Sequence, residues 1–200
     1  MTSIPHRYTI EEYFRMEEKA VERHEYHDGR VFCMAGGTAD HSAVVANSIV
    51  ALGKALDGTT CRVYDSNLRL GLAKSTKFVY PDVQVVCGSL EYDARDATRG
   101  TILNPKVVIE VLSPTTEAYD RGHKFDFYRD VNSLQEYVLI SQHEPRVERF
   151  LRKGQGEWAF APSTGLAAQL NLPTLNISIA LAEIYKNILF PLNHADGPRD

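Results

Sequence analysis

The sequence predicts a mixed α/β fold in which helices flank a central mixed β-sheet. Nearly continuous apolar runs of strand length occur at 107–112 and 136–140 and are typical of strands buried on both faces of a sheet. Apolar residues with helical spacing occur at 10–20 and 41–56. The composition, 44% hydrophobic and 24% charged, is ordinary for a globular protein with one core.

The first half of the chain is expected to alternate helices with short strands. Thr9 and Glu12 have the spacing of a capping box at the start of the first helix. The Asp28-Gly29 pair is typical of a tight turn between two strands. The expected elements are helix 10–20, strands 25–27 and 30–34, helix 41–56, and strands 62–64, 68–72 and 78–86. The buried side of the second helix should consist of Val44, Val45, Ile49 and Leu52.

The second half is expected to begin with a polar segment, 88–104, that forms either an exposed loop or a small excursion. The elements expected after it are strand 106–112, helix 117–130, strand 136–140, a hairpin of 146–151 and 157–160, and a strand with a short helix within 175–188. No internal repeat or composition break interrupts the chain. We therefore expect one domain over residues 1–192, followed by a mobile tail at 193–200.

The charge balance limits how the protein can meet a nucleic acid. The net charge is −4, whereas a protein that coats DNA nonspecifically usually carries a basic surplus. A nucleic-acid substrate would need a local basic patch or a bound cation. The basic residues available for phosphate contacts, unless they only form solvated strand faces, are Arg62, Arg69, Lys74, Lys77, Arg146, Arg149, Arg152 and Lys153.

The cysteines and the N-terminus predict a cytoplasmic protein with no membrane partner. Cys33, Cys61 and Cys87 are odd in number and widely spaced, so we interpret them as small core residues in a reducing compartment. The N-terminal residues lack the apolar segment of a secretory signal. The longest apolar runs are far shorter than the roughly 20 residues that span a bilayer.

Two acidic residues stand out within the predicted strands. Glu110 is the only charged residue in the apolar run 107–112, where an unpaired carboxylate needs a compensating partner. A metal cation is one such partner, and a hydrogen bond to a neighbouring helix is the alternative. Asp82 follows Pro81, which favours an edge, a bulge or a strand start, so Asp82 is either an acid aimed into a cleft or a turn residue. Two carboxylates from neighbouring strands can hold magnesium, an ion that keeps several water ligands.

Lys124 lies on the helix expected directly after the Glu110 strand. Helical spacing places it on the same face as Asp120, Arg121 and Tyr128. A lysine beside a metal site can orient an attacking water or stabilise charge in phosphoryl transfer. An ordinary solvated helix lysine is the alternative.

Taken together, these residues resemble the PD-(D/E)XK nuclease superfamily, and they are most similar to its Uma2 branch of bacterial restriction endonucleases. The resemblance covers residues 7–188. Its motifs are Tyr8-Thr9-Ile10-Glu11-Glu12-Tyr13, Glu25-Tyr26-His27-Asp28-Gly29-Arg30-Val31, His41, Tyr80-Pro81-Asp82-Val83, Ile109-Glu110-Val111-Leu112-Ser113-Pro114, Asp120, Lys124, Tyr128 and Glu136-Tyr137-Val138-Leu139-Ile140. The resemblance implies a restriction-endonuclease-like fold.

The resemblance also implies the roles of the site residues. Asp82 would be the motif aspartate and Glu110 the second acid, together holding magnesium or manganese, with the Val111 carbonyl as a further ligand. The general superfamily pattern has a lysine two residues after the second acid, where this chain has Leu112. In this branch the resemblance points instead to Lys124.

Glu25 and His41 are weaker parts of the same resemblance. Glu25 corresponds to a further acid near the metal, although it could simply pair with Arg23 or Arg30 on its hairpin. His41 matches a position at a helix start and is a pocket residue, a helix-capping residue or a neighbour of a phosphate.

The expected function is therefore metal-dependent hydrolysis of phosphodiester bonds in DNA by a homodimer. The rival hypothesis is a catalytically silent protein of the same fold that binds nucleic acid or a protein partner. A hydrolase of small phosphoesters is a third hypothesis, which the absence of a phosphate-cradling glycine loop in the sequence disfavours.

Overall fold

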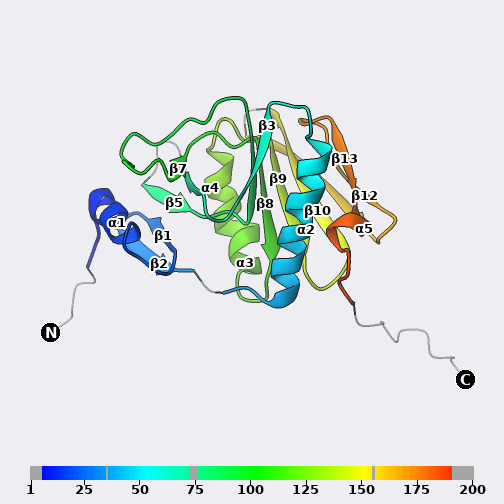
Figure 1. Ribbon diagram of the computed structural model, residues 1–200, viewed down its shortest axis with the longest axis horizontal. Coiled ribbons are helices and arrows are strands. Elements are labelled where there is room, and N and C mark those ends of the chain that lie inside the picture. Colours follow the sequence, from blue (N-terminus) through cyan, green and yellow to red (C-terminus); the bar gives the residue numbers. More distant parts are fainter. Residues whose placement is uncertain (1–5, 35, 73–75, 155, 191–200) are drawn as a thin grey trace, which may run out of the picture.

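The computed structural model describes residues 6–34, 36–72, 76–154 and 156–190. The tail expected at 193–200 and the basic residue Lys74 lie outside this part of the chain. Figure 1 shows the arrangement of the elements, with the helix α1 (Ile10–Glu17) at one end and the helix α5 (Leu181–Ile184) at the other.

A six-stranded mixed sheet carries most of the core, as the sequence predicted. Its strand order is β11-β10-β9-β8-β6-β3. Strands β8 and β9 are parallel and the other neighbours are antiparallel. The strands are β3 (Cys61–Asp65), β6 (Val83–Cys87), β8 (Val107–Leu112), β9 (Glu136–Ser141), β10 (Arg146–Gly154) and β11 (Glu157–Thr164).

A second sheet of five strands, with the order β2-β1-β5-β4-β7, was not predicted. Its strands are β1 (His24–His27), β2 (Arg30–Cys33), β4 (Arg69–Gly71), β5 (Lys77–Val79) and β7 (Thr101–Ile102). The expected single strand 78–86 is wrong, because the chain leaves this sheet after β5 and joins the larger sheet at β6. Pro81 lies at the break, where its missing N–H costs no ladder hydrogen bond.

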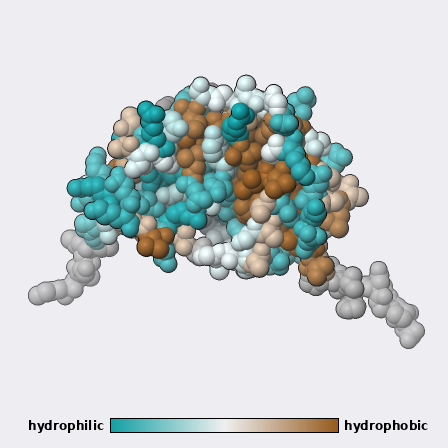
Figure 2. Space-filling view, viewed as in Figure 1, coloured by the Kyte–Doolittle hydropathy of each residue, from teal (hydrophilic) through white to brown (hydrophobic). Residues whose placement is uncertain are grey.

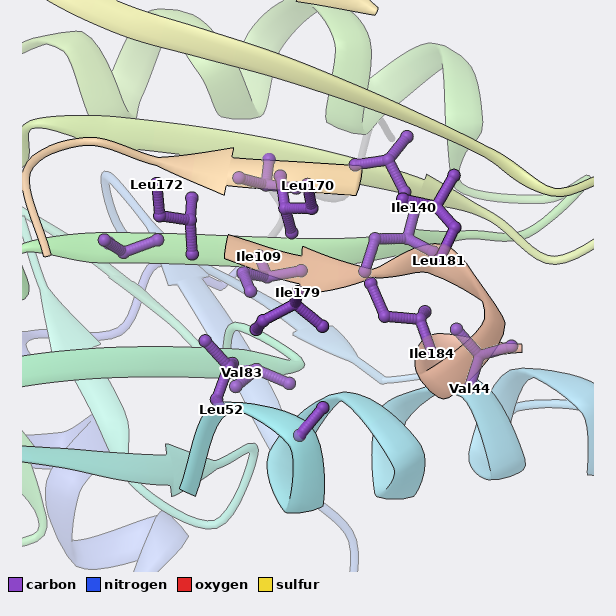
Figure 3. Close-up of a cluster of buried hydrophobic side chains, with 14 of the residues drawn as sticks. Val44, Leu52, Val83, Ile109, Ile140, Leu170, Leu172, Ile179, Leu181 and Ile184 are labelled. Carbon is purple, nitrogen blue, oxygen red and sulfur yellow. The ribbon is translucent and has the colours of Figure 1, made fainter. Parts of the chain in front are cut away.

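Strand β8 separates two hydrophobic clusters, because alternate residues of a strand point to opposite faces of a sheet. Val107, Ile109 and Val111 pack with α2 (Ala39–Ala55). Figure 3 shows Ile109 in the same cluster as Val44 and Leu52 of this helix. The strands β12 (Gln169–Leu172) and β13 (Ile177–Ala180) and the helix α5 (Leu181–Ile184) complete this cluster. Val108 and Leu112 instead pack with Tyr128 on the opposite side. Glu110 lies two positions from both Val108 and Leu112 and therefore points to the same side as they do.

Local sequence signals account for the ends of several elements. Helix α1 (Ile10–Glu17) begins with the predicted capping box, in which Thr9 and Glu12 bond to each other's backbone N–H. At the β1–β2 turn, Asp28 and Gly29 have φ angles of 49° and 90°, as this kind of tight hairpin turn requires. Helix α2 begins after Thr38, whose hydroxyl accepts a hydrogen bond from the His41 N–H.

The helix predicted at 117–130 is built from three consecutive helical segments. They are α3 (Glu117–Tyr119), the π-helical turn η1 (Asp120–Lys124) and α4 (Phe125–Arg129). A π-helical turn shifts the residues after it around the helix axis, and such turns are frequent at functional sites. Among the described residues, none of the helices combines the length and apolar character that crossing a bilayer requires.

Of the two alternatives for segment 88–104, the structure excludes a simple exposed loop, because Asp93 and Asp96 are buried within the segment and it includes β7. The expectation for the cysteines was wrong in part. Cys61 and Cys87 pack against the core, as expected, but they form a disulfide across the β3–β6 ladder. Cys33 is an exposed free thiol and not a core residue.

Candidate functional site

Asp82 and Glu110 lie side by side because β6 and β8 are antiparallel neighbours. Val83 pairs with Ile109, so the residue before β6 faces Glu110. The Asp82 backbone N–H donates to Glu110 Oε2 at 3.3 Å. In return, the Val111 N–H donates to Asp82 Oδ2 at 2.8 Å. Sheet pairing alone therefore brings the two carboxylates together.

Glu110 is 3% exposed and is held by two groups from the following helical segments. Lys124 Nζ lies 2.9 Å from Glu110 Oε1, and the Tyr128 hydroxyl donates to the same oxygen at 2.6 Å. Burial raises the pKa of Glu110, Lys124 lowers it, and the charges of Asp82 and Asp120 raise it further, to about 8 in total. The positive charge of Lys124 therefore does not fully offset burial and the two neighbouring acids at Glu110.

Lys124 is buried at the end of the η1 turn, so it is not a solvated helix lysine. Besides Glu110, its Nζ lies 3.5 Å from Glu25 Oε1 and 3.5 Å from Asp120 Oδ1. Burial lowers the pKa of Lys124, but the three surrounding carboxylates outweigh burial and raise it well above its usual value. Lys124 is therefore a fixed cation at the centre of an acidic cluster.

Glu25 reaches this cluster from β1 and is also buried. Its Oε2 lies 3.4 Å from His27 Nε2 and accepts a hydrogen bond from the Tyr119 hydroxyl at 3.3 Å. Burial raises the pKa of Glu25, yet Lys124 and His27 more than offset burial and hold it below its ordinary value. Glu25 is thus paired with Lys124 and lies beside the His27 ring, and the alternative of pairing with arginines on its hairpin is not needed.

His41, at the start of α2, faces Asp82 with 3.2 Å between His41 Nε2 and Asp82 Oδ2. The hydrogen bond to Asp82 raises the pKa of His41 despite burial, and the Val111 backbone also contributes to this rise. A methyl group at Gly37 would lie 2.8 Å from His41 Nδ1, so only glycine leaves room for this ring position.

These side chains line one cleft of about 270 Å³ between the two sheets and α2. Four carboxylates line it, from Glu25, Asp82, Glu110 and Asp120, whereas its lining cation is Lys124, joined by His41 when that ring is protonated. All the sequence-predicted site residues, including the Val111 backbone, therefore lie at the same cleft.

A hard divalent cation suits the chemistry of this donor set. The oxygen ligands available are carboxylates and a backbone carbonyl, and their negative charge exceeds that of the cations around them. Within the described part of the chain, no three His, Cys, Asp or Glu side chains already converge on a single point. An ion bound by Asp82 and Glu110 would keep several waters, which is the usual state of protein-bound magnesium.

Three residues that contribute to the site were not predicted as site residues. Asp120 and Tyr119 line the cleft, whereas Tyr128 is fully buried and acts only through its hydrogen bond to Glu110. Asp120 and Tyr128 are each four positions from Lys124, and this spacing was a usable signal. Tyr119 is five positions away, and its ring centroid lies 5.9 Å from Lys124 Nζ. A spacing of five residues places side chains on one face only in a π-helix, so the sequence offered no signal for Tyr119.

Most of the basic residues considered for phosphate contacts are already engaged within the protein. Arg69 is buried and lies 2.8 Å from Asp96. Arg152 donates to the backbone carbonyls of residues 129, 131 and 134. The others with internal partners are Arg62, Lys77, Arg146 and Arg149. Lys153 is exposed.

Comparisons with known proteins agree with this fold. The model of a family described as "Uma2: Putative restriction endonuclease" matches residues 10–182. Two uncharacterized proteins of Synechocystis sp., slr1290 and sll1609, are 34% and 31% identical to this chain. The alignments cover 90% of this chain and 92% of slr1290, and 84% of this chain and 94% of sll1609. A crystal structure from Anabaena variabilis, described as that of a "putative nuclease", superposes with a TM-score of 0.69 at 16% identity, covering 88% of this chain and 99% of the other.

Proposed function

We propose, from the premise that this chain belongs to the Uma2 family, that it is a metal-dependent endonuclease that hydrolyses phosphodiester bonds in DNA. The observation that carries the proposal is the acidic cluster around Lys124. Three carboxylates lie within 3.5 Å of one buried lysine, and Asp82 lies beside Glu110 in the same cleft. This arrangement suits a divalent cation and a phosphodiester. Burying so many acids without such a role would only cost stability.

Asp82 and Glu110 would hold magnesium or manganese, with the Val111 carbonyl as a further ligand. A divalent ion in such a site polarises a phosphoryl oxygen and lowers the pKa of a bound water. The residues of this chain supply the rest. Lys124, fixed by Glu110 at 2.9 Å, can hold the attacking water in line or stabilise negative charge on the phosphate. Glu25, which holds Lys124 from the opposite side, keeps the ammonium oriented and can accept a hydrogen bond from the water.

Cleavage of supercoiled plasmid in magnesium or manganese tests the proposal. We expect the wild-type chain to nick or linearise the plasmid and Glu110→Ala to do neither. Glu157→Ala, which removes an exposed acid on β11, is the matched control and should cut like the wild type. No cutting by the wild type with either metal would contradict the proposal.

A silent binding protein is the second candidate, and one observation favours it. Glu110 is already neutralised in part by Lys124 and Tyr128, so the cluster is held together without a metal. Calorimetry separates the two candidates. A nuclease site should bind magnesium and lose that affinity in Asp82→Ala, whereas a silent protein should show no such affinity.

We also propose that the protein acts as a homodimer in the cytoplasm. The family resemblance supports the dimer. Light scattering tests the dimer, because a monomer has a mass of 22.5 kDa.

A further inference from the structure

The rim of the cleft carries an exposed aromatic side chain that the proposed mechanism does not use. Phe32, on the edge strand β2, is 46% exposed and lines the same cleft as Lys124. It pairs with Glu25 in the β1–β2 ladder, and cross-strand partners in a hairpin point to the same face. The Phe32 side chain therefore lies next to an acid that contacts Lys124.

Phe32 is supported by other rings. Its centroid lies 5.2 Å from that of His27, which in turn stacks on Tyr119 at 6.0 Å with an interplanar angle of 23°. The Tyr119 hydroxyl is also held by His27 Nε2, at 3.1 Å. The three rings thus form a supported aromatic row, defined here as Phe32, His27 and Tyr119, that runs from the rim of the cleft towards Lys124.

Electrostatic attraction alone is a poor explanation for how DNA would bind here. The net charge is −4, the cleft has four carboxylates, and most of the candidate phosphate-contacting arginines have partners inside the protein. Proteins that bind single strands combine phosphate contacts with stacking of bases on aromatic side chains. In a duplex the base faces are covered by their neighbours, so only an unpaired base can use such a row.

The size of the cleft agrees with a small ligand. Pockets for drug-sized molecules have volumes of roughly 300–1,000 Å³. The cleft, at about 270 Å³, lies just below this range, which fits one nucleotide better than the full width of a duplex.

We propose that Phe32 is a stacking platform for an unpaired nucleobase, so that the substrate class is single-stranded DNA or a duplex with an unpaired or flipped nucleotide. This inference rests on the proposed function, since it deepens the substrate class of the same cleft. The base would stack on the exposed face of Phe32 while the adjacent phosphodiester approaches Lys124.

The test measures binding and does not depend on cutting. A short single-stranded oligonucleotide containing 2-aminopurine is titrated with the protein, both in EDTA and in magnesium, and the matching duplex is titrated in parallel. We expect the wild type to quench 2-aminopurine fluorescence and to prefer the single strand. Phe32→Ala should weaken single-strand binding by roughly 5- to 150-fold, the value of one base–aromatic stack. Phe32→Leu, which keeps an apolar side chain without a π-face, should weaken it similarly.

Phe160→Ala is the matched control, because Phe160 is also a strand aromatic, 53% exposed, and does not line the cleft. It should bind like the wild type. Equal binding of single strand and duplex by the wild type, no single-strand binding at all, or wild-type binding by Phe32→Ala would each overturn the inference. If any of these outcomes is found while the wild type still cleaves plasmid, the inference fails and the proposed function stands. Single-strand binding that depends on Phe32, without any cleavage, would support the platform and refute the nuclease.

Discussion

Lys124 Nζ and Glu110 Oε1 lie 2.9 Å apart, and this ion pair ties the π-helical turn to the middle of the central strand β8. Both side chains are buried, so neither charge can be solvated by bulk water. A buried ion pair contributes little net stability, but removing one partner leaves the other charge uncompensated. The pair is therefore more informative about function than about folding, and its disruption has a defined consequence.

Lys124→Ala should destabilise the protein in the absence of metal by about 3–5 kcal/mol, because Glu110, Glu25 and Asp120 lose their shared cation. Urea unfolding with and without magnesium measures this. A bound divalent ion stabilises the folded state by mass action. The site of the variant is more negative and should bind magnesium more tightly. Magnesium should therefore add more stability to the variant than to the wild type. Lys153→Ala, on an exposed lysine, should behave like the wild type in both conditions. A Lys124→Ala protein as stable as the wild type without metal would argue against the acidic cluster.

Gly37→Ala should displace the His41 ring, because the added Cβ would lie 2.8 Å from His41 Nδ1. The ring would move away from Asp82, whose hydrogen bond is the main reason that the pKa of His41 is raised. An NMR titration of His41 should therefore show a higher pKa in the wild type and a value closer to 6.5 in the variant.

Gly36→Ala provides the control for this experiment, because a Cβ at Gly36 meets no atom within 4 Å. It should leave the titration of His41 unchanged. The same shift in both variants would mean that the loop, and not the contact of Gly37 with the ring, controls His41.

The strands and turns of the fold were predictable where local patterns decide them. Asp28 and Gly29 specify their turn because both residues tolerate the positive φ angles that this tight hairpin turn requires. Residues 107–112 indicate a buried strand because the run is almost entirely apolar. The division of 78–86 between two sheets depends on which distant strands accept β5 and β6 as neighbours. Contacts between distant parts of the chain therefore decide this division. Pro81 indicated where the strand is interrupted, but not which strands pair with β5 and β6.

The candidate site was predictable for the same local reasons, and only in part. Glu110 stood out because a lone charge in an apolar strand needs a partner, and the structure supplies Lys124 and Tyr128. Tyr119 gave no signal, since the π-helical turn that brings it to Lys124 replaces the spacing of an α-helix. The disulfide was missed because two cysteines 26 residues apart become neighbours only through the β3–β6 pairing.

Asp96 should make the protein acid-sensitive. Burial raises the pKa of Asp96. The hydrogen bonds from Thr101 and Thr98 and the charge of the Arg69 guanidinium outweigh burial and hold this pKa below the usual 3.8. A lowered folded-state pKa contributes stability that is present above pH 3.8 and is lost as the pH falls through the folded-state pKa. Thermal unfolding between pH 2 and pH 7 should show this loss in the wild type.

Asp96→Asn should lose the contribution of Asp96 to that acid-dependent change and should be less stable at neutral pH, because buried Arg69 keeps its charge without a carboxylate. Asp130→Asn, on an exposed acid, should retain the wild-type pH profile. An unchanged acid profile in Asp96→Asn would show that this pair does not govern the response to pH.

Reduction of the Cys61–Cys87 disulfide should loosen the edge strand β3, which pairs only with β6 in its sheet. Cross-links of this kind stabilise proteins by about 2–4 kcal/mol, mainly by restricting the unfolded chain. Dithiothreitol should therefore lower the urea midpoint of the wild type by the equivalent of this free energy. It should leave the urea midpoint of Cys61→Ser/Cys87→Ser unchanged. Cys33→Ser should respond like the wild type, because Cys33 is a free thiol.

Alkylation of unfolded protein taken directly from cells counts the free thiols. Three labelled cysteines would favour the reducing cytoplasm expected from the sequence, because disulfides rarely persist there, and one labelled cysteine would contradict that location.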